Sequence, residues 1–330
     1  LYQKLLKPIL PQLKKTTTDL IIVPDGMLGY LPFEALISEL PKDTSTHNYS
    51  IHNLAYLVED FQINYTYSAN LSLKQESIID LLKIPFEKEK TLLAYAPSFY
   101  GKSDDLLVRS CTDTLAELRC AKTEVQDLRN KWNAKAFLGE KATKKHFLEQ
   151  AVKSDILHLA THACMDDHNP NFNRIYFAEQ EYLTSLELYT LQLRPQLTVL
   201  SACNTGSGQL VKGEGVMSLA RGFMVAGCPS LITTLWGVND FTTQNLMTSF
   251  YEHLYNGEQK DEALRNAKLD YLQDSETTSS HSHPFYWAAF VQLGDNRAMF
   301  KKETPLQSIW FYGLGMVLLG SFVFLFNKKK

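Results

Sequence analysis

Short apolar runs alternate along this chain with segments in which apolar residues recur at helical spacing. Three of the runs, 155–160, 197–202 and 230–235, are apolar almost throughout and are bounded by polar residues. This pattern is typical of central strands that are buried on both faces of a sheet. The alternation predicts an α/β fold with a mainly parallel central sheet flanked by helices.

The other elements follow from the same pattern. Residues 114–132 predict a long helix, with Thr114 as its N-cap and Glu117 completing a capping box. Further strands are expected at 20–23, 61–65, 91–95, 136–138 and 286–292, and further helices at 143–152, 215–226, 242–255 and 260–273. The loops at 41–50 and 99–111 are too short to link independent domains, so residues 1–300 are expected to form one domain.

Composition narrows the classes of function. The 330 residues are 45% hydrophobic and include 33 basic and 36 acidic side chains, a formal charge of −3. Because this balance comes without a stripe of Lys and Arg, we expect no binding to nucleic acid. The five scattered cysteines contain no Cys-x-x-Cys pair. We therefore expect reduced thiols in a cytosol-facing compartment, and neither a zinc ribbon nor a thioredoxin-type site.

Residues 309–326 contain no charged side chain. Eighteen helical residues rise about 27 Å, close to the ~30 Å hydrocarbon core of a bilayer. Trp310 and Tyr312 stand where interfacial aromatic residues belong, and residues 328–330 are lysines. We predict one transmembrane helix that anchors the C-terminal segment 301–330; a buried core helix is the alternative. Basic residues on both sides leave the orientation open, and the expected reduced thiols favour a cytoplasmic catalytic domain.

Two of the predicted strands end in reactive side chains. His162 stands where the strand 155–160 gives way to a loop, and Cys203 follows the strand 197–202. In open α/β sheets, ligands bind at the carboxyl ends of the strands. A thiol with a pKa near ~8.5 is mostly protonated at neutral pH, so a neighbouring imidazole is needed to form the attacking thiolate. The pair predicts thiol catalysis; an inert buried cysteine and a structural histidine are the alternative.

A metal site is a further alternative for the first of these strand ends. His158, His162 and Cys164 form a His-x-x-x-His-x-Cys run, in which the two histidines share one face of a strand. The run lacks a fourth ligand and a known zinc spacing. We therefore expect no metal, and His158 is expected to be buried and hydrogen-bonded within the sheet. No motif in the sequence implies a cofactor.

The residues around the two strand ends resemble blocks of a known family. Asp155-Ile-Leu-His-Leu-Ala-Thr-His162 and Leu200-Ser-Ala-Cys203-Asn-Thr-Gly206 are similar to the two catalytic blocks of the CHAT family of caspase-like cysteine peptidases. Its other blocks resemble residues 23–35, 213–221, 226–230, 236–240 and 283–290. All of these blocks occur in the family's order, over about residues 1–294.

The resemblance implies a caspase-like three-layer αβα sandwich in which His162 is the base and Cys203 the nucleophile of a catalytic dyad. The oxyanion donors would be the N–H groups of Cys203 and Ala163. The family usually has glycine at the position of Ala163; alanine can donate its N–H if φ stays negative, whereas a strained positive φ would count against full activity. Ser201 stands where related enzymes carry an acidic S1 residue, so their preference for basic P1 residues does not transfer.

Three residues beyond the dyad are candidates for substrate binding: Glu214, Trp236 and Asp240. Glu214 and Asp240 could bind a basic P1 side chain or orient the dyad. Alternatively, Glu214 is an acidic residue near a helix start and Asp240 an N-cap. Trp236 could form the wall of a pocket or lie in the core.

These observations predict a membrane-anchored cysteine endopeptidase that cleaves a protein partner. The chain begins with Leu1 and shows no signal-peptide pattern, so we expect it to be the C-terminal part of a longer protein. The resemblance implies tetratricopeptide repeats in the preceding part, which would regulate the enzyme. The alternative function is a catalytically inactive interaction or scaffold module of the CHAT type, which Ala163 would favour.

Overall fold

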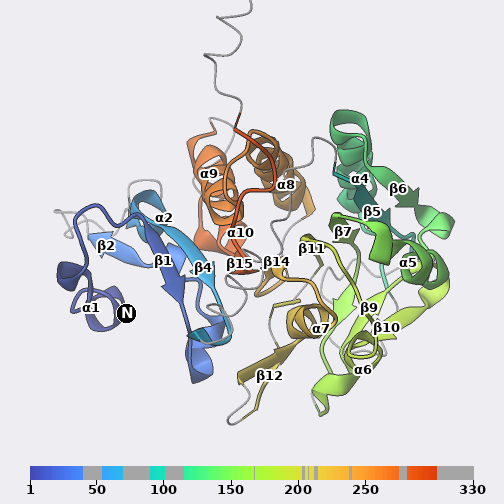
Figure 1. The fold of residues 1–330 in the computed structure, drawn as a ribbon, viewed down its shortest axis with the longest axis horizontal. Coiled ribbons are helices and arrows are strands. Elements are labelled where there is room, and N and C mark those ends of the chain that lie inside the picture. The colour runs from blue at the N-terminus through green and yellow to red at the C-terminus, as the bar shows by residue number, and fades with distance from the viewer. Residues whose placement is uncertain are drawn as a thin grey trace, which may run out of the picture.

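The computed structural model describes residues 1–39, 54–69, 90–100, 115–166, 168–202, 205–206, 208–211, 215–237, 240–274 and 281–302. Within them, eight strands form one sheet in the order β1-β4-β15-β14-β11-β7-β5-β6 (Figure 1). These strands are β1 (Asp19–Ile22), β4 (Gln62–Tyr65), β5 (Leu92–Ala96), β6 (Lys135–Leu138), β7 (Ile156–Ala160), β11 (Leu197–Ser201), β14 (Ser230–Thr234) and β15 (Phe290–Gly294). Every neighbouring pair is parallel except β14 and β15, which confirms the predicted, mainly parallel sheet.

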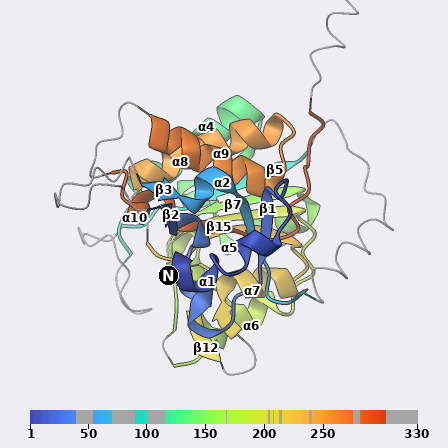
Figure 2. The same ribbon diagram turned by 90° about the vertical axis from the view of Figure 1, so that its left-hand side faces the viewer.

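Helices cover both faces of this sheet and make the fold a three-layer αβα sandwich (Figure 2). One face carries α4 (Arg119–Trp132), α8 (Asp240–Tyr255) and α9 (Lys260–Gln273), and the other carries α5 (Lys144–Gln150), α6 (Ser185–Leu188) and α7 (Leu219–Val225). Three further helices are short: α1 (Tyr2–Leu5), α2 (Leu57–Asp60) and α10 (Pro284–Trp287). Successive residues of a central strand enter opposite cores: Val199 packs on the α4 side and Leu200 on the α7 side. Burial on both faces explains why these strands read as continuous apolar runs.

Two small antiparallel sheets follow the carboxyl ends of the central strands. β8 (Ala163–Cys164) comes directly after β7 and pairs with β9 (Arg174–Tyr176), which pairs with β10 (Tyr182–Thr184). After β11, β12 (Gly208–Val211) and β13 (Gly215–Ser218) form a hairpin. A third pair, β2 (Ile37–Glu39) and β3 (Ala55–Tyr56), lies apart from both.

The predicted start of the long helix is wrong. Helix α4 begins at Arg119, and Leu118 at its N-cap position makes no side-chain hydrogen bond to the helix. The Glu117 carboxylate instead accepts a hydrogen bond of 2.8 Å from the backbone N–H of Phe99, so it is not part of a capping box. A tertiary contact has replaced the local one; Thr114 lies outside the described residues.

Two other elements differ from the prediction. The helix expected from residue 215 begins only at Leu219, because Ser218 caps it by accepting from the N–H of Arg221 and the preceding residues form β13. The last strand begins at Phe290, since α10 occupies the start of the predicted run with Pro284 in its first turn.

Several predicted segments lie outside the described residues: the loop 41–50, most of the loop 99–111, and the transmembrane helix 309–326. Among the described residues, no helix combines the length and the apolar composition that a membrane span requires.

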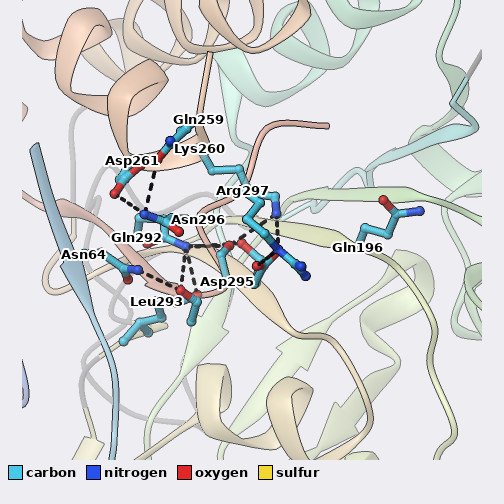
Figure 3. Close-up of polar contacts among 12 residues, drawn as sticks. Asn64, Gln196, Gln259, Lys260, Asp261, Gln292, Leu293, Asp295, Asn296 and Arg297 are labelled. Carbon is cyan, nitrogen blue, oxygen red and sulfur yellow. Dashed lines mark hydrogen bonds and ion pairs between the residues drawn. The ribbon is translucent and has the colours of Figure 1, made fainter. Parts of the chain in front are cut away.

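A buried ion pair holds the chain in place where it leaves β15 (Figure 3). The Lys260 ammonium lies 2.8 Å from Oδ2 of Asp295, whose Oδ1 accepts a 2.7 Å hydrogen bond from Arg297. The side-chain amide of Asn296 donates to the carboxylate of Asp261 at 2.7 Å, and the backbone carbonyl of Asn296 accepts from the backbone N–H of Lys260. These contacts fix the start of α9 against the segment after β15, at the opposite edge of the sheet from β8 and the β12–β13 hairpin.

Candidate active site

Strands β7 and β11 run parallel and side by side, and their register aligns the two predicted catalytic positions. Ser201 at the end of β11 pairs with Ala160 at the end of β7. His162 and Cys203 each stand two residues further along the chain. Cys203 itself lies outside the described residues. The two chain segments thus leave the sheet at neighbouring points of one edge.

His162 is 3% exposed and is held by the segment that precedes α4. Its Nε2 lies 2.7 Å from the carbonyl oxygen of Ala116, and the ring of Phe99 packs edge-on against it with 4.9 Å between centroids. A carbonyl oxygen can only accept a hydrogen bond, so Nε2 must carry the proton. In the neutral imidazole this leaves Nδ1 as the atom that can take a proton.

The residues on either side of Cys203 are tied to the neighbouring strand β14. The hydroxyl of Thr234 donates to the carbonyl of Ala202 at 2.5 Å, and the N–H of Gly206 donates to the carbonyl of Thr234 at 2.8 Å. Thr205 is fully buried, with its hydroxyl 2.8 Å from that of Thr233. These bonds anchor the chain immediately before and shortly after the predicted nucleophile.

Gly206 is required in this loop by a close approach. A Cβ atom at this position would lie 2.8 Å from Cγ2 of Thr233 and 3.2 Å from the backbone oxygen of Thr234. Any side chain would push the loop away from β14. Gly206, three residues after the predicted nucleophile, therefore allows the loop to pack closely against β14.

Ala163 takes its place in β8 without backbone strain. It is absent from the described non-glycine residues with positive φ, which are Asn133, Glu179 and Gln180. The N–H of Tyr176 donates to the carbonyl of His162 at 3.0 Å, and Ala163 is opposite Ile175. Because hydrogen-bonded and non-hydrogen-bonded pairs alternate along an antiparallel ladder, the N–H of Ala163 points away from β9.

A buried polar network lies directly behind this edge, between the sheet and α4. Glu124 of α4 is 4% exposed; its Oε2 accepts a 3.2 Å hydrogen bond from Ser201, and its Oε1 lies 3.0 Å from Nε2 of His158 without hydrogen-bond geometry. Nδ1 of His158 is 3.1 Å from the hydroxyl of Tyr251 on α8. The sequence predicted that His158 is buried and hydrogen-bonded, but it did not predict the role of Glu124. In the sequence, Glu124 is simply one acidic residue within a predicted helix.

A sequence profile of the CHAT domain matches residues 1–295. The chain belongs to the CHAT domain family. Among curated proteins, tetratricopeptide repeat protein 28 of Mus musculus and of Homo sapiens are each 30% identical to it over 114 residues. That stretch is 34% of this chain and 4% of each relative, so the chain spans only a small part of their length.

Two solved structures are similar in fold to this CHAT domain. One is the Saccharomyces cerevisiae separase–securin complex, with a TM-score of 0.48, 13% identity, and coverage of 74% of this chain and 14% of that one. The other is the Arg-specific cysteine proteinase gingipain R, with a TM-score of 0.45, 12% identity, and coverage of 73% and 55%. Membership of the family rests on the profile match alone.

The CHAT domain places the three substrate-binding candidates differently. Trp236 follows β14 at the candidate active-site edge and is partly buried; its ring stacks on Phe285 with centroids 6.4 Å apart, and its Nε1 donates to the carbonyl of Phe285 at 2.8 Å. Asp240 is the first residue of α8, but the structure does not describe its side chain. Glu214 lies outside the described residues. Of the three candidates, Trp236 is the one whose side chain the structure describes.

The cysteines correct one expectation about this CHAT domain. Cys164 is disulfide-bonded, so the thiols are not all reduced as expected. Cys228 is fully buried, and burial raises the pKa of its thiol to about 12. Among the described side chains, no three His, Cys, Asp or Glu residues gather to hold a metal ion.

Proposed function

We propose that this CHAT domain is a cysteine endopeptidase in which Cys203 is the nucleophile and His162 the general base. The observation that carries the proposal is the register of β7 and β11, which pairs Ser201 with Ala160. Ala160 and Val199 both pack on the α4 face of the sheet. Side chains along a strand alternate with a period of two, so positions 162 and 203 are expected to share that face.

The bonding of His162 suits the role of a base. The thiol of Cys203 passes its proton to Nδ1 of His162, and the thiolate attacks the carbonyl carbon of the scissile peptide bond. The imidazolium then protonates the leaving amine, and a water molecule deprotonated by the same ring hydrolyses the thioester. Throughout, the Ala116 carbonyl keeps Nε2 protonated and stabilises the imidazolium.

The oxyanion of the tetrahedral intermediate needs N–H donors. We assign these to Cys203 and Ala163. Support comes from the negative φ of Ala163 and from the direction of its N–H away from β9. The same finding removes the reason to favour a catalytically inactive scaffold, which rested on the loss of glycine at this position.

The experiment is a comparison of peptide cleavage by the purified chain and by Cys203→Ala and His162→Ala, using a peptide library read by mass spectrometry. Both variants should lose turnover while keeping the circular dichroism spectrum of the parent. A covalent thiol probe adds a substrate-free check, since Cys203 should react much faster than the buried Cys228. Turnover that persists in Cys203→Ala would exclude the proposed nucleophile.

The wider setting is proposed from the sequence and the relatives. We propose that the domain cleaves a protein substrate, that tetratricopeptide repeats precede it in the same polypeptide, and that residues 309–326 anchor it to a membrane. The support is the similarity to tetratricopeptide repeat protein 28 and the uncharged segment 309–326.

A further inference from the structure

The register of the central sheet places Trp236 beside the two positions of the proposed dyad. Parallel pairing of β11 with β14 sets Val199 opposite Ile232, so position 203 comes opposite position 236 four residues later. Each of these positions follows its strand by two residues, as His162 does after β7. Along this edge of the sheet the order is therefore His162, Cys203 and Trp236, at strand spacings of about 4.8 Å.

Trp236 also lies on the face of the sheet that is expected for the dyad. It packs against the core on the α4 and α8 side, to which Val199 and Ile232 belong. Helix α10 packs against α8 and therefore lies on this side as well. The backbone N–H of Leu235 donates to the carbonyl of Ala289 at 2.9 Å, which holds the end of α10 at the carboxyl end of β14 (Figure 1). Helix α10 is thus a neighbour of the proposed site.

The first turn of α10 presents an exposed aromatic ring at this place. Phe285 is 48% exposed, and its ring lies at 16° to that of Trp236 with 6.4 Å between centroids. Nε1 of Trp236 donates to the carbonyl of Phe285 at 2.8 Å, and the ring of Tyr286 meets that of Phe285 edge-on at 5.4 Å. Among the described residues, no lysine or arginine lies over the ring of Trp236 or Phe285. The aromatic surface is therefore apolar and held in place.

The position and order of this surface distinguish it from an ordinary exposed residue. Apolar residues that stand singly on a surface are common and need no function. Phe285, however, is stacked on Trp236 beside the proposed nucleophile, so that little side-chain entropy remains to be lost when a ligand covers it. An aliphatic or aromatic side chain laid on these rings removes apolar surface from water on both partners. A polar side chain of the same size would lose its hydration there without gaining a hydrogen bond.

We propose that Phe285 and Trp236 bind an aliphatic or aromatic side chain of the substrate polypeptide, within about three residues of the peptide bond that is cleaved. One strand spacing and the 6.4 Å between the two rings bring Phe285 to roughly 11 Å from the nucleophile position, a distance that about three extended residues span. The proposal rests on the peptidase function and adds to it a preference for an apolar residue.

The first test measures binding without cleavage. Fluorescent ten-residue peptides carry one central leucine in an alanine–glycine background, and a twin set carries asparagine, which has nearly the same size. Binding to the full chain with Cys203→Ala is followed by fluorescence anisotropy. The leucine peptides should bind more tightly than their twins. Phe285→Ala should reduce that preference about 3- to 10-fold, whereas Phe285→Tyr, which keeps the ring, should retain it.

The second test locates the bound side chain relative to the cleaved bond. The peptide library that tests the proposed function is cut by the parent and by Phe285→Ala, and the products are read by mass spectrometry. Peptides cut by the parent should be enriched in leucine, isoleucine or phenylalanine at one position within about three residues of the cut. Phe285→Ala should lose that enrichment while still cutting the library.

Phe172→Ala is the matched control. Phe172 is 46% exposed, but it belongs to the turn before β9, in the small sheet that follows β7. Its loss should leave the leucine preference unchanged. Equal binding of leucine and asparagine peptides, no binding of either set, an equal loss in Phe285→Ala and Phe172→Ala, or cleavage without apolar enrichment would overturn the proposal. If the library stays uncut while the leucine preference and its dependence on Phe285 persist, the binding site stands and the peptidase function fails.

Discussion

Replacing Lys260 by methionine should destabilise the protein strongly. Lys260 is 1% exposed, and its ammonium lies 2.8 Å from Oδ2 and 3.2 Å from the backbone oxygen of Asp295. Removing one partner of a buried ion pair costs about 3–5 kcal/mol, and here it leaves the Asp295 carboxylate with the partly exposed Arg297 as its remaining described cation. In domains of 150–250 residues each kcal/mol lowers Tm by about 2–4 °C, so Lys260→Met should lower Tm by roughly 6–20 °C.

The assay is thermal and urea unfolding followed by circular dichroism, with Arg297→Gln as the matched control. Arg297 bonds to the same carboxylate, but its side chain is 37% exposed, so its loss should cost less than about 1 kcal/mol. Replacing both Lys260 and Asp295 by apolar residues should restore much of the lost stability, because a buried pair can be exchanged for hydrophobic packing at little cost. A Lys260→Met variant as stable as Arg297→Gln would refute the reasoning.

The pH dependence of stability gives an independent check on this pair. Burial opposes ionisation of Asp295, but the charges and hydrogen bonds of Lys260 and Arg297 outweigh it and lower its pKa. A carboxyl whose folded pKa is depressed contributes stability above its unfolded pKa, near ~3.9, and loses it as the pH falls through the folded value. The difference in Tm between parent and Lys260→Met should therefore shrink below about pH 4.

Four further changes test other parts of the structure. Thr234→Val removes the donor to the Ala202 carbonyl and should cost about 1–3 kcal/mol in urea unfolding, whereas Thr234→Ser should retain most of it. Burial opposes protonation of His253, but the carboxylates of Glu258 and Asp270 outweigh it and raise the pKa of the imidazole. The parent should therefore have its full Tm advantage over His253→Gln below about pH 6.5 and lose it as the pH rises through the folded pKa. A Tm difference that stays constant with pH would contradict this. Ala163→Gly should leave cleavage unchanged and lower stability by about 0.5–1 kcal/mol, and a large gain in turnover would show that alanine impairs the site. Deleting 309–326 should abolish flotation with liposomes, and flotation that persists would argue against the anchor.

The central sheet was predictable because its strands are buried on both faces. The runs 155–160, 197–202 and 230–235 correspond to β7, β11 and β14, which are continuous in apolar character because each side of the sheet is covered by helices. Helix 260–273 was also correct at both ends. Such elements depend on hydrophobic patterning, which a single sequence displays directly.

The errors have a different physical origin. The capping-box pattern at Thr114 and Glu117 was a local signal, and it failed because Glu117 bonds to Phe99, which is 18 residues earlier in the chain. The helix predicted from residue 215 is wrong over residues 215–218, because β13 pairs there with β12, a partner that periodicity does not reveal. In the first case a hydrogen bond to a residue 18 positions away outweighed the local preference, and in the second the pairing with the strand just before it did so.

The candidate site shows the same difference between residues that directly follow a strand and groups that contact them from other elements. The sequence predicts that His162 and Cys203 each follow a strand by two residues. Because these two strands are parallel neighbours in register, residues at equal distances after their ends leave the same edge of the sheet. The groups that would tune them come from other elements: the Ala116 carbonyl that fixes the tautomer of His162, and the Thr234 hydroxyl that holds the chain before Cys203. Neither has a sequence signature, since one is a backbone atom and the other a threonine in an apolar strand. The residues of the proposed dyad can therefore be identified from the sequence, whereas the protonation state and alignment of His162 depend on tertiary contacts.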